Sequence, residues 1–212
     1  VCDDDISTEA VSYLAASQLT VAGVPAIVLR IGFVGELGYE IHVPSHLAEH
    51  VWRELMTAGA ALGIQPFGVE AQRRLRLDKQ HFLAGQDTDA LSNPYDAGLP
   101  WIVKLDKPDF VGRRALERAS QRDPGQQLVG FRIEGNQVPP EPSLVLVEGR
   151  LEGRVTSARY SPAAGATIGL AWVPAESAEN GCQISIQLDG RLVNAVVQRE
   201  PFYDPEGARL KS

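Results

Sequence analysis

Cysteine, methionine and long apolar runs are scarce in this chain of 212 residues. Its two cysteines, Cys2 and Cys182, lie too far apart to indicate a disulfide framework or a paired-cysteine metal motif. No apolar run approaches the roughly 20 residues that a membrane-spanning helix needs, and the acidic start is unlike a secretory signal. We therefore expect a cytoplasmic protein with reduced thiols, no metal site and no membrane partner.

Positive charge is also in deficit, because 20 Lys and Arg residues face 27 Asp and Glu residues, which gives a net charge of -7. Nucleic-acid-binding proteins gain much of their affinity from clustered cations, so nucleic acid is not an expected partner. The 44% of hydrophobic residues is enough to bury a core of one large or two small domains.

Residues 1–123 combine helix-like and strand-like segments, which predicts an α+β region. Apolar spacing and capping residues predict helices from Ser7 to about 15, at 45–63, at 69–78 and at 111–120. Extended segments are predicted at 24–33, 39–43 and 101–105. The first two would form a β-hairpin, with a tight reversal at Gly35–Gly38.

Residues 124–212 are dominated by short β-like runs about ten residues apart. The predicted strands are 127–133, 144–147, 153–160, 167–173, 183–188 and 192–199. Asp189-Gly190 is a strong signal for a hairpin turn. This pattern predicts a small antiparallel β-barrel or sandwich, with a domain boundary near residue 124.

The segment Arg30–Ile41 carries two carboxylates, Glu36 and Glu40, around the predicted reversal. A carboxylate at the start of a returning strand can point into a cavity. On residue types alone, an ordinary turn with solvated glutamates is the favoured interpretation.

Several segments, taken together, resemble the aminomethyltransferase family of glycine-cleavage T-proteins. They are GELGYEI at 35–41, PFGVEA at 66–71, LRLDK at 75–79, GQDTD at 85–89, KPDFVGRRAL at 107–116 and GRVTS at 153–157. GQDTD, KPDF and the ending FYDPEGARL are most similar to the folate-binding module of the sarcosine oxidase alpha subunit, with dimethylglycine dehydrogenase related. The resemblance implies a ferredoxin-like α+β region followed by a C-terminal β-barrel.

The resemblance also implies tetrahydrofolate as cofactor and the transfer of a one-carbon unit from a small amine or iminium substrate. Glu40 is the residue expected to hold the pterin ring, because a carboxylate can accept two parallel hydrogen bonds from a ring NH and its exocyclic amine. Tyr39 and Trp101 offer flat apolar surfaces to such a ring. Gln72 stands where many T-proteins have an arginine that contacts folate, and an amide lacks the charged fork of arginine.

The family's catalytic aspartate lies in a region before the residues present here, so no catalytic residue is assigned. The start at Val1 favours a piece of a longer protein. We do not expect this piece to catalyse the reaction alone.

Two other interpretations stay open. One is a non-catalytic folate-module remnant, or a domain that docks on the flavoprotein part of a larger oxidoreductase; no Gly-rich nucleotide fingerprint indicates a flavin site here. The other, remote alternative is a zinc hydrolase, because His46-x-x-Glu49-His50 matches a zinc-peptidase pattern.

Overall fold

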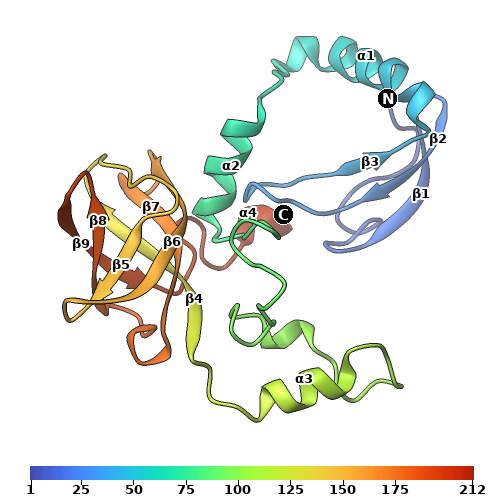
Figure 1. Cartoon of the computed structure of the whole chain (residues 1–212). Helices are drawn as coiled ribbons and strands as arrows, with labels where there is room; N and C mark the ends of the chain where they lie inside the picture. Colours follow the sequence, from blue (N-terminus) through green and yellow to red (C-terminus); the bar gives the residue numbers. More distant parts are fainter. The chain divides into compact units, whose positions relative to one another are not determined.

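The computed structural model describes all 212 residues, which form two compact units of an α+β protein (Figure 1). The first unit comprises Val1–Arg73 and Glu206–Ser212, and the second comprises Arg74–Pro205. No helix has the length and apolar character needed to cross a membrane. The domain boundary expected near residue 124 stays a prediction.

The first unit contains a three-stranded antiparallel sheet in the order β1-β2-β3. Its strands are β1 (Ala16–Val21), β2 (Val24–Leu29) and β3 (Glu40–His42). Ala22 and Gly23 join β1 to β2 with φ angles of 51° and 75°. A two-residue type I′ turn, whose twist matches that of the flanking strands, requires positive φ at both central residues.

Helix α1 (Ala48–Gly59) belongs to the same unit and lies between two short 3₁₀ turns, Ser45–Leu47 and Ala60–Leu62. Its buried Val51 packs against valines of β1 and β2. The helical segment ends at Gly63, whose φ of 74° is easily adopted by glycine. The sheet is thereby covered on one face. A four-residue helix, α4 (Ala208–Lys211), also belongs to this unit.

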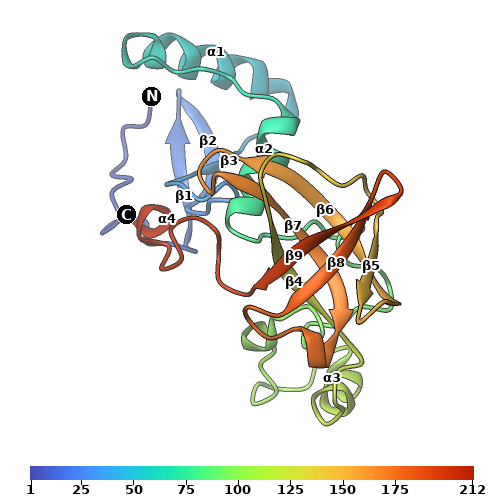
Figure 2. The same cartoon turned by 90° about the vertical axis from the view of Figure 1, so that its left-hand side faces the viewer.

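The second unit is built on a closed antiparallel barrel in the order β4-β7-β6-β5-β8-β9 (Figure 2). The strands are β4 (Gln126–Glu134), β5 (Leu144–Val147), β6 (Arg150–Ser161), β7 (Ala166–Pro174), β8 (Gln183–Leu188) and β9 (Arg191–Gln198). Pairing of Gly130–Arg132 with Val196–Gln198 closes the ring. Closure leaves no free sheet edge.

Strand β7 is buried along its whole length because both of its faces are covered. Ala171 and Val173 face the barrel interior, where Phe131 is fully buried. The alternate residues of β7 pack in a second cluster with Leu77 of helix α2 (Val69–Asp78). Because successive side chains of a strand point to opposite faces, β7 contributes residues to both hydrophobic clusters.

The barrel, the α+β class, the helix at 69–78 and the hairpin at Asp189-Gly190 confirm the sequence-based predictions. Strands β5 and β8 begin and end at the predicted residues. The helix predicted at 111–120 is present as α3 (Arg113–Ser120). Asp189 and Gly190 both have positive φ, at 49° and 78°.

The helix predicted from Ser7 is wrong. Only one turn forms, in which Val11 N donates to Ser7 O at 2.8 Å. Leu14 then adopts a φ of 68° and β1 begins at Ala16. A single turn gives too few hydrogen bonds to repay helix nucleation, so pairing of β1 with β2 decides the local structure.

The strand predicted at 101–105 is also wrong, because Pro100–Ile102 form a 3₁₀ turn with proline at its start. Proline fixes a helical φ and pre-organises such a turn.

The predicted pairing of 24–33 with 39–43 is confirmed, but the tight reversal is wrong. Leu29 pairs with Glu40, so ten residues connect the strands. The glycines of this connection permit close packing: a Cβ on Gly38 would lie 2.7 Å from Ile31 O.

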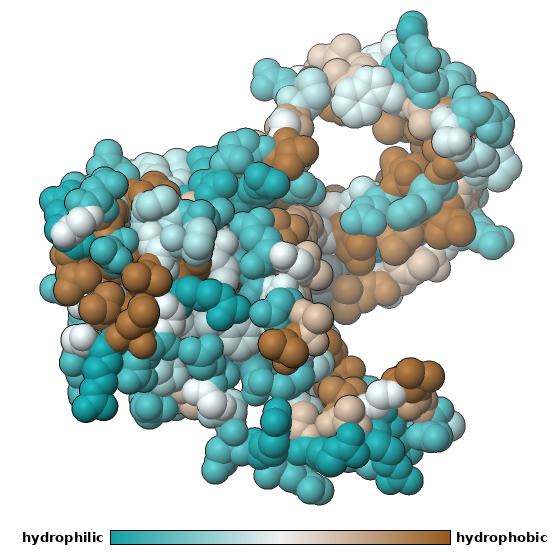
Figure 3. All heavy atoms as spheres, viewed as in Figure 1, coloured by the Kyte–Doolittle hydropathy of each residue, from teal (hydrophilic) through white to brown (hydrophobic).

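Apolar side chains also reach the surface of the barrel unit. Figure 3 shows them gathered over the part of the barrel that carries β5, β8 and β9. Among the exposed residues of the barrel strands are Leu144, Leu151 and Leu192.

Gly169 of β7 is a position where the barrel core admits no side chain. A Cβ there would lie 2.2 Å from Ser157 O and 2.4 Å from the ring of Phe131. Gly169→Ala should therefore lower the free energy of unfolding by about 1–3 kcal/mol through overpacking. Urea denaturation measures the change. Gly125→Ala is the matched control, since its Cβ would meet nothing within 4 Å; equal stability of the two variants would contradict the prediction.

Candidate functional site

Glu40 is the first residue of β3, and strand alternation decides where its side chain points. Ile41 packs in the core of the first unit, so Glu40 and His42 share the opposite face of the strand. The Glu40 side chain is 53% exposed, and its Oε2 lies 3.4 Å from Nε2 of His42. Both oxygens therefore retain lone pairs that can accept hydrogen bonds from a ligand.

Tyr39 precedes Glu40 but serves mainly to hold the first unit together. Its hydroxyl donates to Ile6 O at 2.6 Å, and the guanidinium of Arg30 lies 5.1 Å from its ring centroid. Arg30 is fully buried and donates to the carbonyl oxygens of Leu210 and Ser212. One face of the Tyr39 ring is thus covered by a cation. Its contact with a ligand stays a prediction.

The other two predicted site residues lie on different elements. Gln72 is exposed on α2 and makes no side-chain hydrogen bond, so none joins it to Glu40. Trp101 belongs to the second unit, where it is 65% exposed and lines a cavity of about 320 Å³. Glu40 and Tyr39 are adjacent in the chain, and the binding roles of all four residues stay predictions.

The His46-x-x-Glu49-His50 segment lies on the surface, and two of its side chains have protein partners. Nε2 of His50 lies 3.0 Å from Ala22 O. Glu49 accepts two hydrogen bonds from Arg53, at 2.6 and 3.0 Å. No group of three or more His, Cys, Asp or Glu residues is arranged to hold a metal ion.

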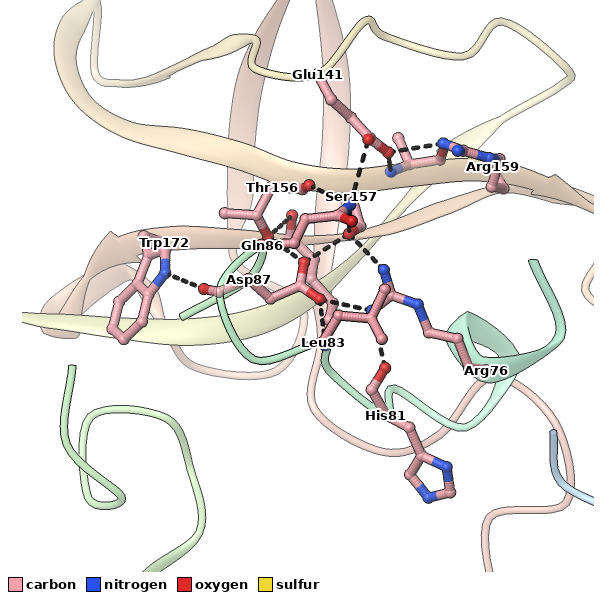
Figure 4. Close-up of polar contacts among 12 residues, drawn as sticks. Arg76, His81, Leu83, Gln86, Asp87, Glu141, Thr156, Ser157, Arg159 and Trp172 are labelled. Atoms are coloured by element: carbon pink, nitrogen blue, oxygen red, sulfur yellow. Dashed lines mark hydrogen bonds and ion pairs between the residues drawn. The ribbon is translucent and has the colours of Figure 1, made fainter. Parts of the chain in front are cut away.

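The most extensive polar cluster lies in the second unit, around a buried pair of Arg76 and Asp87 (Figure 4). Arg76 Nη1 donates to Asp87 Oδ2 at 2.6 Å and to His81 O at 2.8 Å. Leu83 N donates to the same carboxylate oxygen at 2.7 Å. The pair therefore connects the end of α2 to the loop that follows it.

The other oxygen of Asp87 binds the barrel wall. Asp87 Oδ1 accepts from Thr156 Oγ1 at 2.7 Å and from Ser157 Oγ at 2.5 Å, both on β6. Ser157 Oγ in turn accepts from Arg76 Nη2 at 2.6 Å and from Gln86 Nε2 at 2.9 Å. The single O–H and both lone pairs of Ser157 Oγ are therefore used in hydrogen bonds.

Two further contacts extend this cluster. Trp172 Nε1 donates to Asp87 O at 2.7 Å. Glu141 accepts from Ala158 N and from Arg159 Nη1, both at 2.7 Å, and Gln86 Nε2 lies 3.3 Å from its second oxygen. Local sequence patterns do not reveal this cluster, because Asp87 and Ser157 are 70 residues apart and only the barrel brings them together.

Asp78 and Lys79, at the end of α2, form a second buried polar cluster. Asp78 accepts a hydrogen bond from Ser161 Oγ, and burial raises the pKa of this carboxyl, opposed by that hydrogen bond and by the charge of Arg74. Lys79 Nζ donates to Tyr203 O at 3.2 Å and to the main-chain oxygen and carboxylate of Asp204. This cluster fixes the segment that leaves β9.

Comparison with known families shows two matches in succession. The family described as the GCVT N-terminal domain matches residues 1–107, and the glycine cleavage T-protein C-terminal barrel domain matches residues 126–204. The fold therefore places the chain in the class of proteins in which an α+β region is followed by a barrel of the T-protein type. The chain belongs to the glycine cleavage T-protein (aminomethyltransferase) family.

Individual relatives agree with this assignment. The aminomethyltransferase of Halothermothrix orenii is 37% identical over 183 residues, which are 86% of this chain and 51% of the relative. That of Thermotoga petrophila is 37% identical over 198 residues, or 93% and 54%. The chain thus spans about half the length of the curated relatives it matches.

A solved structure agrees at the level of the fold. The glycine cleavage system aminomethyltransferase T of Bartonella henselae superposes with a TM-score of 0.83 at 24% sequence identity, over 92% of this chain and 53% of that one.

Asp87→Asn should strongly destabilise the second unit. The substitution leaves the buried charge of Arg76 uncompensated and replaces an acceptor oxygen with an amide NH2 that faces other donors, so the free energy of unfolding should fall by about 3–5 kcal/mol. Urea denaturation tests this, with Glu49→Gln as the control because its ion pair with Arg53 is exposed. A loss no larger than that of the control would show that the cluster is dispensable.

The stability difference between the parent chain and Asp78→Asn should depend on pH. Because the pKa of Asp78 is raised by burial, its contribution is full below the unfolded pKa near 3.9 and is lost as the pH rises through the folded pKa. Asn cannot titrate but keeps an oxygen for Ser161. The variant should therefore gain stability relative to the parent as the pH rises above about 4, the unfolded pKa of Asp. Urea titrations at several pH values would refute this if the difference stayed constant.

Proposed function

We propose that this chain is the tetrahydrofolate-binding part of an aminomethyltransferase-like module that passes a one-carbon unit from a small amine to tetrahydrofolate. The observation that carries the proposal is the family match, which extends through the segment around Glu40 and through the barrel. The relatives named aminomethyltransferase support the reaction class.

Glu40 fits the expected role in pterin binding. Its carboxylate is more than half exposed, and its one ion-pair partner, His42, is itself exposed and 3.4 Å away. Displacing such a contact costs little, whereas a pterin can offer two adjacent N–H groups to the two oxygens. Charge-assisted hydrogen bonds of this kind are stronger than neutral ones.

Bound tetrahydrofolate would supply the nitrogen nucleophile that captures the one-carbon unit. The contribution of this chain is to orient the pterin through Glu40, with Tyr39, Gln72 and Trp101 as further predicted contacts. The donor we propose is a small amine such as glycine, sarcosine or dimethylglycine. A flavoprotein domain or subunit as partner and a cytoplasmic location belong to the same proposal.

Glu40→Gln should weaken tetrahydrofolate binding by about 1.5–3 kcal/mol, because glutamine replaces one acceptor oxygen with a donor and removes the charge. Isothermal titration calorimetry of the whole chain with tetrahydrofolate, under anaerobic conditions, measures the affinity. Glu49→Gln is the matched control and should bind as the parent does.

Equal affinities of the parent and Glu40→Gln would remove Glu40 from the site. Binding that depends on Glu40, without one-carbon transfer from glycine, sarcosine or dimethylglycine, would favour the non-catalytic alternative. No binding to the parent chain would contradict the proposal that this chain is the tetrahydrofolate-binding part of the module.

A further inference from the structure

The segment 206–212 belongs to the first unit, although the residues just before it belong to the second. Its helix α4 lies beside the connection between β2 and β3 (Figure 1). Leu210 is buried against this connection, and a Cβ on Gly32 would clash with its side chain. Arg209 Nε donates to Glu36 Oε2 at 2.8 Å. Residues 206–212, which we call the C-terminal strap, are therefore packed on the connection that leads into β3.

Arg30, at the start of this connection, is the residue that the strap holds most deeply. Its side chain is fully buried. Its Nη1 lies 3.5 Å from Leu210 O, its Nη2 donates to Ser212 O, and its Nε has no partner. A buried guanidinium needs acceptors for its N–H groups, and the strap supplies them. The position of the Arg30 side chain therefore depends on the strap.

Arg30 and Tyr39 extend the pairing of β2 with β3 by one residue. Leu29 pairs with Glu40 at the end of the ladder, so Arg30 and Tyr39 are the next residues on the two strands. The Arg30 guanidinium lies 5.1 Å from the centroid of the Tyr39 ring, which is a cation–π contact. The Tyr39 hydroxyl donates to Ile6 O at 2.6 Å. The residue directly before Glu40 is thus held by Arg30 and by the N-terminal segment.

We propose that Arg30 is a positioning residue for Glu40 and that the C-terminal strap keeps Arg30 in that role. The inference rests on the proposed function, in which Glu40 binds the pterin. Two parallel hydrogen bonds to a planar ring require a carboxylate of fixed direction. Strand β3 has only three residues, so it makes few ladder hydrogen bonds of its own. The contacts at its first residue therefore decide how Glu40 points.

Deletion of residues 208–212 tests the strap. It removes both acceptors of Arg30 and no residue of the barrel unit. Native-state hydrogen exchange of the protected β3 amides should become at least about 10-fold faster, because the strand loses support where it begins. Exchange in β7 should stay as in the parent. Lys211→Gln is the control, since Lys211 Nζ donates at 2.8 Å to Glu206 O within the strap itself.

Calorimetric titration with tetrahydrofolate, under anaerobic conditions, tests the effect on the site. The truncated chain should bind at least about 5-fold more weakly than the parent, the scale of one weakened hydrogen bond. Arg30→Met keeps an unbranched stem but has no donor and no charge, so it should show the same loss with the strap present. Arg30→Lys keeps a cation for the Tyr39 ring and should recover part of the affinity.

Three results would overturn the proposal. One is unchanged exchange of the β3 amides in the truncated chain. Another is faster exchange with unchanged affinity, which would show that the strap only stabilises the first unit. The third is a loss of affinity in Glu40→Gln without a loss in Arg30→Met, which would keep Glu40 in the site and remove Arg30 from its support.

Failure of the proposed function itself is recognised separately, as absence of tetrahydrofolate binding to the parent chain. The position of Glu40 is then read from the NMR resonances of its carboxyl carbon and of the His42 ring, which lies 3.4 Å from it. Shifts of both resonances in the truncated chain and in Arg30→Met, with none in Lys211→Gln, would support the positioning role. Unchanged resonances would overturn it.

Discussion

The second unit depends on the buried ion pair between Arg76 and Asp87. Neither side chain is more than 1% exposed, so each charge would carry a large desolvation penalty if it stood alone. The cost is offset because Asp87 accepts four hydrogen bonds, from Arg76, a backbone N–H and two hydroxyls of β6. The end of α2, the loop that follows it and barrel strand β6 therefore meet at one carboxylate.

The rest of the second unit follows from this attachment. Once the end of α2 is held on the barrel, Leu77 covers the outer residues of β4 and β7. Asp78 and Lys79 then meet Ser161 and the segment at Tyr203 and Asp204. Gln80 adopts a φ of 56°, and its side chain lies where a Cβ on Gly130 would be, which explains why glycine stands at that position.

The sequence predicted the features that local patterns control. Alternation and the Asp189-Gly190 turn located the barrel strands, and the break at Pro66-Phe67-Gly68 located the start of α2. The outcome of competition between local signals and strand pairing was not predictable. The turn that begins at Ser7 does not continue as a helix, because β1 begins at Ala16. The apolar residues after Pro100 form a 3₁₀ turn and not a strand. For the site, Glu40 could be named only from resemblance. Arg76 and Asp87 lie in two segments that resemble the aminomethyltransferase family. The residues next to them in the sequence do not indicate that Ser157 is a partner.

The covering of β7 on both faces has a consequence for motion. All nine of its residues are buried, and it pairs with β4 on one side and β6 on the other. Its amide hydrogens can reach solvent only if the barrel interior and the layer under α2 open together. The two hydrophobic clusters share β7, so we expect them to open together, and native-state hydrogen exchange along this strand should report the unfolding of the whole second unit.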